Sequence, residues 1–210
     1  YSAKPQVTVT SGNFDHTVVV RLLNSFPDNV KVRYTLNGYA PSQTSALFPD
    51  SIEIAATAVL KLIAFDDDTT IFHSFCEFNT YFINEEFSLP VFSVAADQLT
   101  DLAEGDRELR PVGSIEYFDL SRTRKSVGYG ELNSHGQDSW VLNQRSLDWI
   151  TRDEMGYSAA IYQPIFDLSE REEFQRFIFR ASGDDNYPAI KDGSHDGSTH
   201  LRDEYVHTLA

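Results

Sequence analysis

The 210-residue sequence predicts a mainly β fold with an α+β second part: a small antiparallel β-sandwich over residues 1–84, followed by an α+β region over residues 85–210. Three observations support this prediction. Before residue 84, short β-branched runs alternate with turn residues, which is typical of small sandwiches. Acidic charge concentrates afterwards, since residues 1–84 hold 8 acidic and 5 basic side chains and residues 85–210 hold 24 and 12. The hydrophobic content of 41% is enough for a packed core.

The first region contains six expected strands, each bounded by turn residues. They cover residues 6–10, 17–23, 30–36, 51–54, 58–65 and 70–82. In the third strand Val32, Tyr34 and Leu36 alternate with polar residues, so one face is expected to be buried. Asn37 and Gly38 follow this strand and predict a tight hairpin turn with positive φ, a conformation that glycine adopts without steric cost.

The second region is expected to begin after a junction at residues 79–88. Its strands are predicted at residues 89–94, 112–118, 127–132, 146–150 and 174–181, and an amphipathic segment at 96–103 predicts a helical turn. The charged residues 170–173 are expected to begin a short helix. A further helix is expected over 199–209, because Leu201, Tyr205 and Leu209 recur at helical spacing and Thr199 can cap the first turn.

Charge and composition argue against several classes of partner. A net charge of −15 repels phosphate backbones, so nucleic acid is not an expected partner. No apolar run reaches the ~18 residues that a membrane-spanning helix needs. Cys76 is the one cysteine, so it has no intramolecular disulfide partner, and we expect it in a half-buried strand.

The densest polar cluster lies in the last thirty residues, in the loops at 182–187 and 191–198 and in the helix that follows. Its candidate site residues are Asp184, Asp185, Arg202 and Asp203. His200, Asp203 and His207 would share one helix face and could serve a divalent metal. The spacing matches no known ligand motif, however, so the metal ligands stay unassigned and a solvated polar loop is the alternative. No GxSxG elbow or phosphate-binding glycine loop assigns catalytic residues.

Three short motifs in the first region resemble those of a known accessory domain. They are YTLNG at 34–38, LF at 47–48 and LKLIAF at 60–65. They are similar to the immunoglobulin-like domain found at the C-terminus of chitobiases. The resemblance implies an immunoglobulin-like sandwich over residues 1–84 that is an accessory domain without activity of its own.

Motifs in the second region resemble the N-terminal part of the CotH-type spore-coat kinase family, over residues 89–210. They are LPVFSV at 89–94, PVGSIEYFD at 111–119, HGQDS at 135–139, QRSL at 144–147, PIF at 164–166, FIFRASGDD at 177–185 and LRD at 201–203. The family is an atypical kinase-like phosphotransferase that uses ATP and Mg²⁺. By this similarity Arg145 stands where the family has a lysine that contacts a nucleotide phosphate.

The two resemblances imply a secreted or cell-surface bacterial protein that acts on a protein substrate or contacts a surface glycan. The family's catalytic carboxylates lie beyond residue 210, so the region 85–210 is an incomplete kinase-like domain. We therefore expect the 210 residues alone to be inactive and to need no cofactor. The alternative is a non-catalytic surface interaction or carbohydrate-binding protein in which the kinase-like region is a scaffold.

Overall fold

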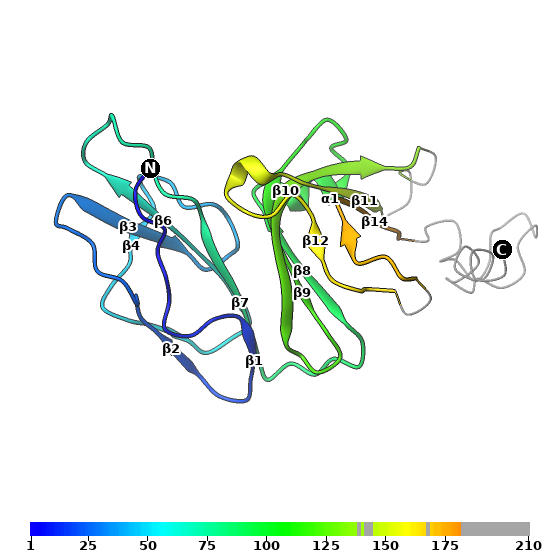
Figure 1. Cartoon of the computed structure of the whole chain (residues 1–210), viewed down its shortest axis with the longest axis horizontal. Coiled ribbons are helices and arrows are strands. Elements are labelled where there is room, and N and C mark those ends of the chain that lie inside the picture. Colours follow the sequence, from blue (N-terminus) through cyan, green and yellow to red (C-terminus); the bar gives the residue numbers. More distant parts are fainter. Residues whose placement is uncertain (138–139, 141–144, 167–168, 182–210) are drawn as a thin grey trace, which may run out of the picture. The chain divides into compact units, whose positions relative to one another are not determined.

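The computed structural model describes residues 1–137, 140, 145–166 and 169–181 (Figure 1). The chain divides into two compact units. Unit 1 comprises Tyr1–Asp97, Val112–Glu131 and Thr151–Gln175, and unit 2 comprises Gln98–Pro111, Leu132–Ile150 and Arg176–Ala210. We describe each unit by itself. The fold is mainly β, as expected from the sequence.

The sandwich of unit 1 consists of a five-stranded sheet in the order β1-β7-β6-β3-β4 and a two-stranded sheet β2-β5. The strands of the larger sheet are β1 (Gly12–Phe14), β3 (Val30–Thr35), β4 (Ala46–Leu47), β6 (Ala58–Asp66) and β7 (Glu77–Ile83). Those of the smaller sheet are β2 (Val18–Val20) and β5 (Ile52–Ile54). All neighbours are antiparallel except β1 and β7, which run parallel.

One face of β6 supplies the centre of the sandwich core. Leu60, Leu62 and Ala64 alternate along this strand and are fully buried between the two sheets. The other members of this cluster are Val7, Val18, Val20, Val32, Ile52, Ile54, Tyr81 and Ile83. Every member lies within residues 7–83, so the sandwich has a hydrophobic core of its own.

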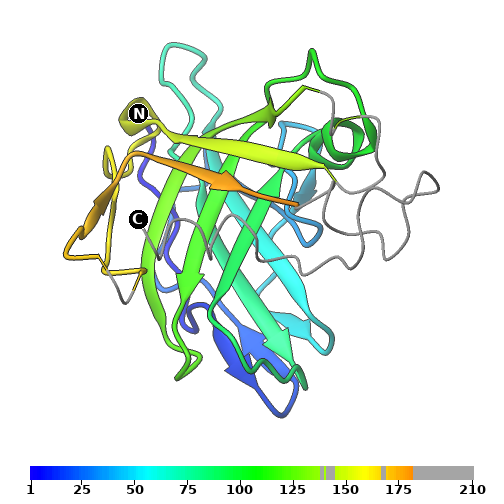
Figure 2. The same cartoon turned by 90° about the vertical axis from the view of Figure 1, so that its right-hand side faces the viewer.

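The opposite face of β6 and β7 is also buried, which a two-layer sandwich does not explain. Lys61 and Ile63 of β6 and Phe78 and Thr80 of β7 point to this side and are each at most 6% exposed. A second layer of unit 1 covers them. It contains β8 (Val91–Ala96), β9 (Val112–Phe118) and the first part of β10 (Arg124–His135), which lie side by side in Figure 2.

The rest of unit 1 is the segment Thr151–Gln175, which includes η2 (Asp153–Met155), β12 (Ile161–Tyr162) and β13 (Glu173–Phe174). Tyr157 from this segment donates a hydrogen bond to the carbonyl of Cys76 (2.5 Å) and packs on Phe78. Gly156 lies against the ring of Phe75 with a φ of 79°, where a Cβ atom would meet the ring at 2.5 Å. This close approach requires glycine.

The described part of unit 2 contains α1 (Leu99–Glu104), the end of β10, β11 (Ser146–Thr151, whose last residue falls in unit 1) and β14 (Arg176–Phe179). β11 and β14 pair antiparallel from Leu147 opposite Phe179 to Ile150 opposite Arg176. In the strand order of this sheet β11 lies between β14 and β10, whose end belongs to unit 2. No helix among the described residues is long and apolar enough to cross a membrane.

Some expected elements differ from those of the structure. Residues 170–173 do not begin a helix, since Glu173 pairs with Tyr162 in the β12-β13 ladder. Residues 6–10 contribute only an isolated bridge from Val7 to Leu22. Residues 70–76 form a loop, so the expected strand 70–82 is shorter and Cys76 lies just before it. The helix expected over 199–209 lies outside the described residues.

The Asn37–Gly38 turn is confirmed in its backbone conformation but not in its place. Gly38 has a φ of 78°, and the Asn37 side chain accepts a hydrogen bond from the backbone N–H of Tyr39. The two residues do not join β3 directly to its hairpin partner, because β4 begins only at Ala46. Gly38 instead donates to the carbonyl of Val59 in β6.

Candidate functional site: a buried carboxylate network in unit 1

Glu116 is the most unusual side chain of the described structure because it is a carboxylate inside a buried strand. Six of the seven residues of β9 are buried, and Glu116 is 1% exposed. A buried ionisable group needs compensating hydrogen bonds or a charge partner, since transfer out of water is costly. The partners of Glu116 therefore define the candidate site.

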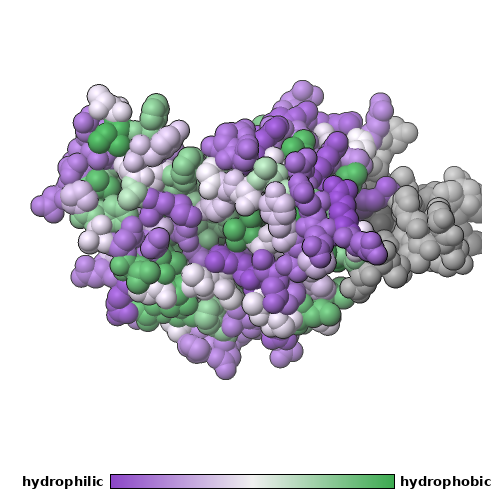
Figure 3. All heavy atoms as spheres, in the orientation of Figure 1, coloured by the Kyte–Doolittle hydropathy of each residue, from purple (hydrophilic) through white to green (hydrophobic). Residues whose placement is uncertain are grey.

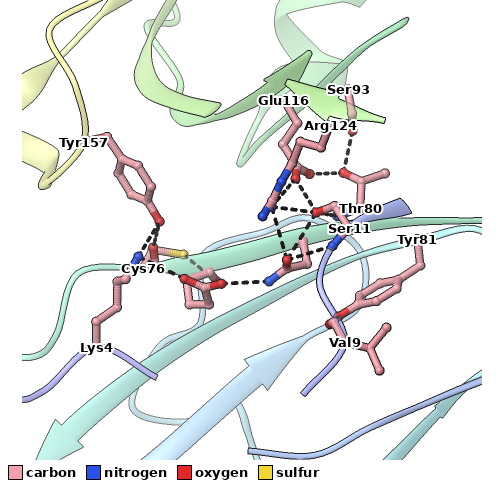
Figure 4. A network of polar contacts seen from close by, with 12 residues as sticks. Lys4, Val9, Ser11, Cys76, Thr80, Tyr81, Ser93, Glu116, Arg124 and Tyr157 are labelled. Carbon is pink, nitrogen blue, oxygen red and sulfur yellow. Dashed lines mark hydrogen bonds and ion pairs between the residues drawn. The ribbon is translucent and has the colours of Figure 1, made fainter. Parts of the chain in front are cut away.

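The carboxylate of Glu116 is held by three donors from three different strands or loops (Figure 4). Ser11 donates its hydroxyl to one oxygen and Thr80 donates to the other. Arg124, from β10, places its guanidinium 2.9 Å from the oxygen that Ser11 also contacts. Ser93 lies 2.7 Å from the Thr80 hydroxyl and can donate to it while Thr80 donates to Glu116.

A second set of contacts extends the network toward the N-terminus. The side-chain carbonyl of Asn79 accepts from the backbone N–H of Ser11 (3.0 Å) and from Arg124 (3.2 Å). The Asn79 amide in turn donates to Glu77 at 2.9 Å, and Glu77 pairs with Lys4 at 3.0 Å. The Asn79 amide thus links two ion pairs, Lys4–Glu77 and Arg124–Glu116, into one continuous polar network.

The pKa of Glu116 is raised, and the largest cause is burial, which disfavours the charged form. The hydrogen bonds from Ser11, Thr80 and Arg124 act in the opposite direction but do not cancel it. A raised carboxyl pKa in a cleft is a common sign of an acid catalyst. Glu116 is almost fully enclosed and both its oxygens are already bonded, so the geometry favours a structural junction over a catalytic group.

Lys61 is a second buried charge in the same layer. Its ammonium donates to the carbonyl of Ala95 at 2.8 Å and lies 5.5 Å from the centre of the Tyr129 ring. Burial lowers the pKa of Lys61, which is typical of an activated amine. Because the residue is 0% exposed, no substrate can approach it in this arrangement.

In the structure the side chain of Arg145 contacts the end of helix α1, within unit 2. Its guanidinium donates to the carbonyl of Ala103 at 2.9 Å and to the carbonyl of Trp140 at 3.1 Å. The last carbonyls of a helix lack partners within the helix, so the first contact completes α1. A phosphate contact at Arg145 stays a prediction.

The other expected site residues, Asp184, Asp185, Arg202 and Asp203, lie outside the described residues, as do His200 and His207. Within the described ranges, no group of three metal-ligating side chains comes together. Glu116 was not among the site residues predicted from the sequence. A single acidic residue between apolar neighbours in a predicted strand was the signal that could have identified it.

Comparison with known proteins gives one match. Residues 5–71 match the family model described as the chitobiase/beta-hexosaminidase C-terminal domain. No curated protein and no solved structure gives a significant match to the chain. The match supports the immunoglobulin-like part of the expected resemblance, and no comparison supports the kinase part. The sandwich of unit 1 is thus similar to the C-terminal domain of chitobiase and beta-hexosaminidase.

Proposed function

We propose that this chain is a non-catalytic, carbohydrate-associated part of a secreted or surface protein. The observation that carries the proposal is the match of residues 5–71 to a domain named after chitobiase and β-hexosaminidase. The matched residues contain most of the strands that enclose the sandwich core. An accessory domain of this kind serves binding or positioning rather than chemistry.

The buried network supports the same proposal. Glu116 and Lys61 have the shifted pKa values that active sites exploit, yet both are enclosed by protein and bonded to it. Their contacts join β1, β6 and β7 of the sandwich to β8, β9 and β10 within unit 1. A rigid junction of this kind would hold the sandwich in a fixed position on the next layer, as an accessory domain requires.

Co-sedimentation with insoluble chitin tests the proposal. We expect the 210-residue protein to sediment with chitin and to release no reducing sugar from it on long incubation. Serum albumin is the control for non-specific retention. A protein that stays in the supernatant, or one that hydrolyses the polymer, would contradict the proposal.

The second candidate is a CotH-like phosphotransferase with ATP and Mg²⁺ as cofactors and a protein as substrate. The observation in its favour is the set of sequence motifs at 89–94, 111–119, 144–147 and 177–185, which resemble that family. Catalysis of phosphoryl transfer rests on positioning and on charge stabilisation by metal ions. A region with 24 acidic and 12 basic residues repels a triphosphate unless metal is bound.

Calorimetric titration of Mg²⁺·ATP distinguishes the two candidates. For the accessory candidate we expect no heat of binding with either the 210-residue protein or the full-length gene product. For the phosphotransferase candidate the full-length product should bind Mg²⁺·ATP, and Arg145→Ala should weaken that binding. Arg110→Ala removes an arginine that bonds only to nearby carbonyls among the described contacts and is the matched control.

A further inference from the structure

The five-stranded sheet of unit 1 has an outer face, which points away from the sandwich core. The second layer of unit 1 covers this face over β6 and β7, and a groove lies on the same face beside β3. Lys31 and Arg33 of β3 point to this face, and Lys31 pairs directly with Phe65 across the β3-β6 ladder. Two adjoining hollows, of about 230 and 160 Å³, lie here and share Gln43 and Phe65 in their walls. Both belong to the region that matches the accessory-domain model, except for residues 72 and 73.

The groove combines aromatic faces with polar side chains. Phe72 is 68% exposed although its ring centre lies 5.4 Å from that of Tyr1, and His73 next to it is also exposed. The rings of His73 and Phe65 are 5.6 Å apart. In Figure 3, apolar residues lie among hydrophilic ones at the upper left, where Figure 1 draws the loop between β6 and β7.

This composition suits a sugar ring better than a peptide or a charged ligand. A pyranose has one apolar C–H face that packs on an aromatic ring and hydroxyls that need donors and acceptors. Gln43 lines both hollows and supplies a donor and an acceptor on the side of Phe72, while Arg33 and Asp67 supply a donor and an acceptor in the adjoining hollow. Both signs of charge occur in the groove, so it offers no net attraction for an anionic polymer, which the net charge of −15 would also repel.

We propose that the groove beside β3, with Phe72 as its stacking platform, is a binding site for a neutral N-acetylhexosamine oligosaccharide. The site rests on the proposed carbohydrate association and assigns it to particular residues. Phe72 provides the face on which one sugar ring stacks and Gln43 bonds the hydroxyl or acetamido groups of that ring, while Arg33 and Asp67 bond a neighbouring ring in the adjoining hollow. The buried network of Glu116 takes no part in binding.

The experiment is a ¹⁵N-NMR titration of the 210-residue protein with fully N-acetylated chitohexaose. We expect amide shifts concentrated in residues 31–33, 43 and 65–73. Phe72→Ala should weaken binding about tenfold, because one stacked ring contributes that order of affinity. Gln43→Ala should weaken it a few-fold. Phe166→Ala, which removes another exposed phenylalanine (52%) of unit 1, is the matched control and should bind as the unsubstituted protein does.

The outcomes separate this site from the broader proposal. Binding with shifts in other segments, or equal affinity of the Phe72→Ala and unsubstituted proteins, would overturn the groove while leaving the carbohydrate association intact. Failure of the unsubstituted protein to bind both chitohexaose and insoluble chitin would overturn both. An unchanged melting temperature of each variant shows that lost binding does not reflect lost folding.

Discussion

Glu116 should make the stability of unit 1 depend on pH. Burial raises its pKa in the folded state above the ordinary value, so the folded protein holds a proton that the unfolded chain has already released. The folded state therefore binds more protons, and stability falls as pH rises from the ordinary carboxyl pKa through the raised one. Below that window the penalty is absent.

Glu116→Gln tests this dependence because it keeps the shape and removes the titration. Urea unfolding between pH 4 and 8 should show a smaller loss of stability with rising pH in the variant than in the unsubstituted protein. Each unit of pKa elevation corresponds to about 1.4 kcal/mol. Arg124, Lys4, Glu77 and Lys61 are the other charges in this layer and remain in both proteins. Parallel pH profiles for the two proteins would contradict the prediction.

Cys76 should be inert in the folded protein although it is a free thiol. It is 7% exposed, and burial raises its pKa to about 11, so very little thiolate is present at pH 8. We expect iodoacetamide to label it slowly in buffer and rapidly in 6 M urea, with mass spectrometry as the measurement. Equal rates in both conditions would show that the loop before β7 opens freely.

At the scale of elements, Gly38 connects the β3-β4 loop to β8. Its φ is 78°, and a Cβ atom there would lie 2.8 Å from the Cβ of Ala95. Gly38→Val should therefore destabilise the protein by more than ~1 kcal/mol, measured by thermal melting, because backbone strain and a steric clash add. Gly38→Ala combined with Ala95→Gly removes the clash and keeps the strain. If the double variant is no more stable than Gly38→Ala alone, the contact with Ala95 is unimportant.

The sequence was most informative where the two faces of a strand differ or where a run is continuously apolar. The strands expected at 30–36, 58–65 and 112–118 correspond closely to β3, β6 and β9. It was misleading where pairing overrides local preference. Glu173 lies in a run of charged residues that favours a helix, but it pairs with Tyr162 in a β-ladder. Ser74 lies in a segment whose sequence is typical of a strand, but it belongs to a loop and bonds to Ala64 through both its backbone and its hydroxyl.

The network around Glu116 could not be predicted from the sequence for a similar reason. Ser11 and Thr80 are 105 and 36 residues away from Glu116 along the chain, and each is an ordinary strand or turn residue by itself. Only the stacking of β9 on β7 brings them to one carboxylate. A long-range polar cluster carries no local pattern, whereas the core positions of β6 follow directly from its alternation.

At the scale of the molecule, the independent folding of residues 1–84 stays a prediction, and the packing indicates how stable this fragment should be. The sandwich core lies within residues 7–83, so a fragment of residues 1–84 should fold cooperatively. The same fragment loses the layer that covers Lys61, Ile63, Phe78 and Thr80. We therefore expect a native β-type circular dichroism spectrum, together with a lower melting temperature than that of the whole chain.

A substitution at Lys61 separates the two expectations for the fragment, which are cooperative folding and a melting temperature lowered by loss of the covering layer. In the whole chain the pKa of Lys61 is lowered by burial, and in the fragment it should return to its ordinary value because the ammonium faces water. Lys61→Met should therefore be neutral or stabilising in the whole chain, where the ammonium is buried. In the fragment it should leave stability nearly unchanged and increase self-association, measured by analytical ultracentrifugation. A fragment without a cooperative transition would show that the second layer is required for the sandwich to fold.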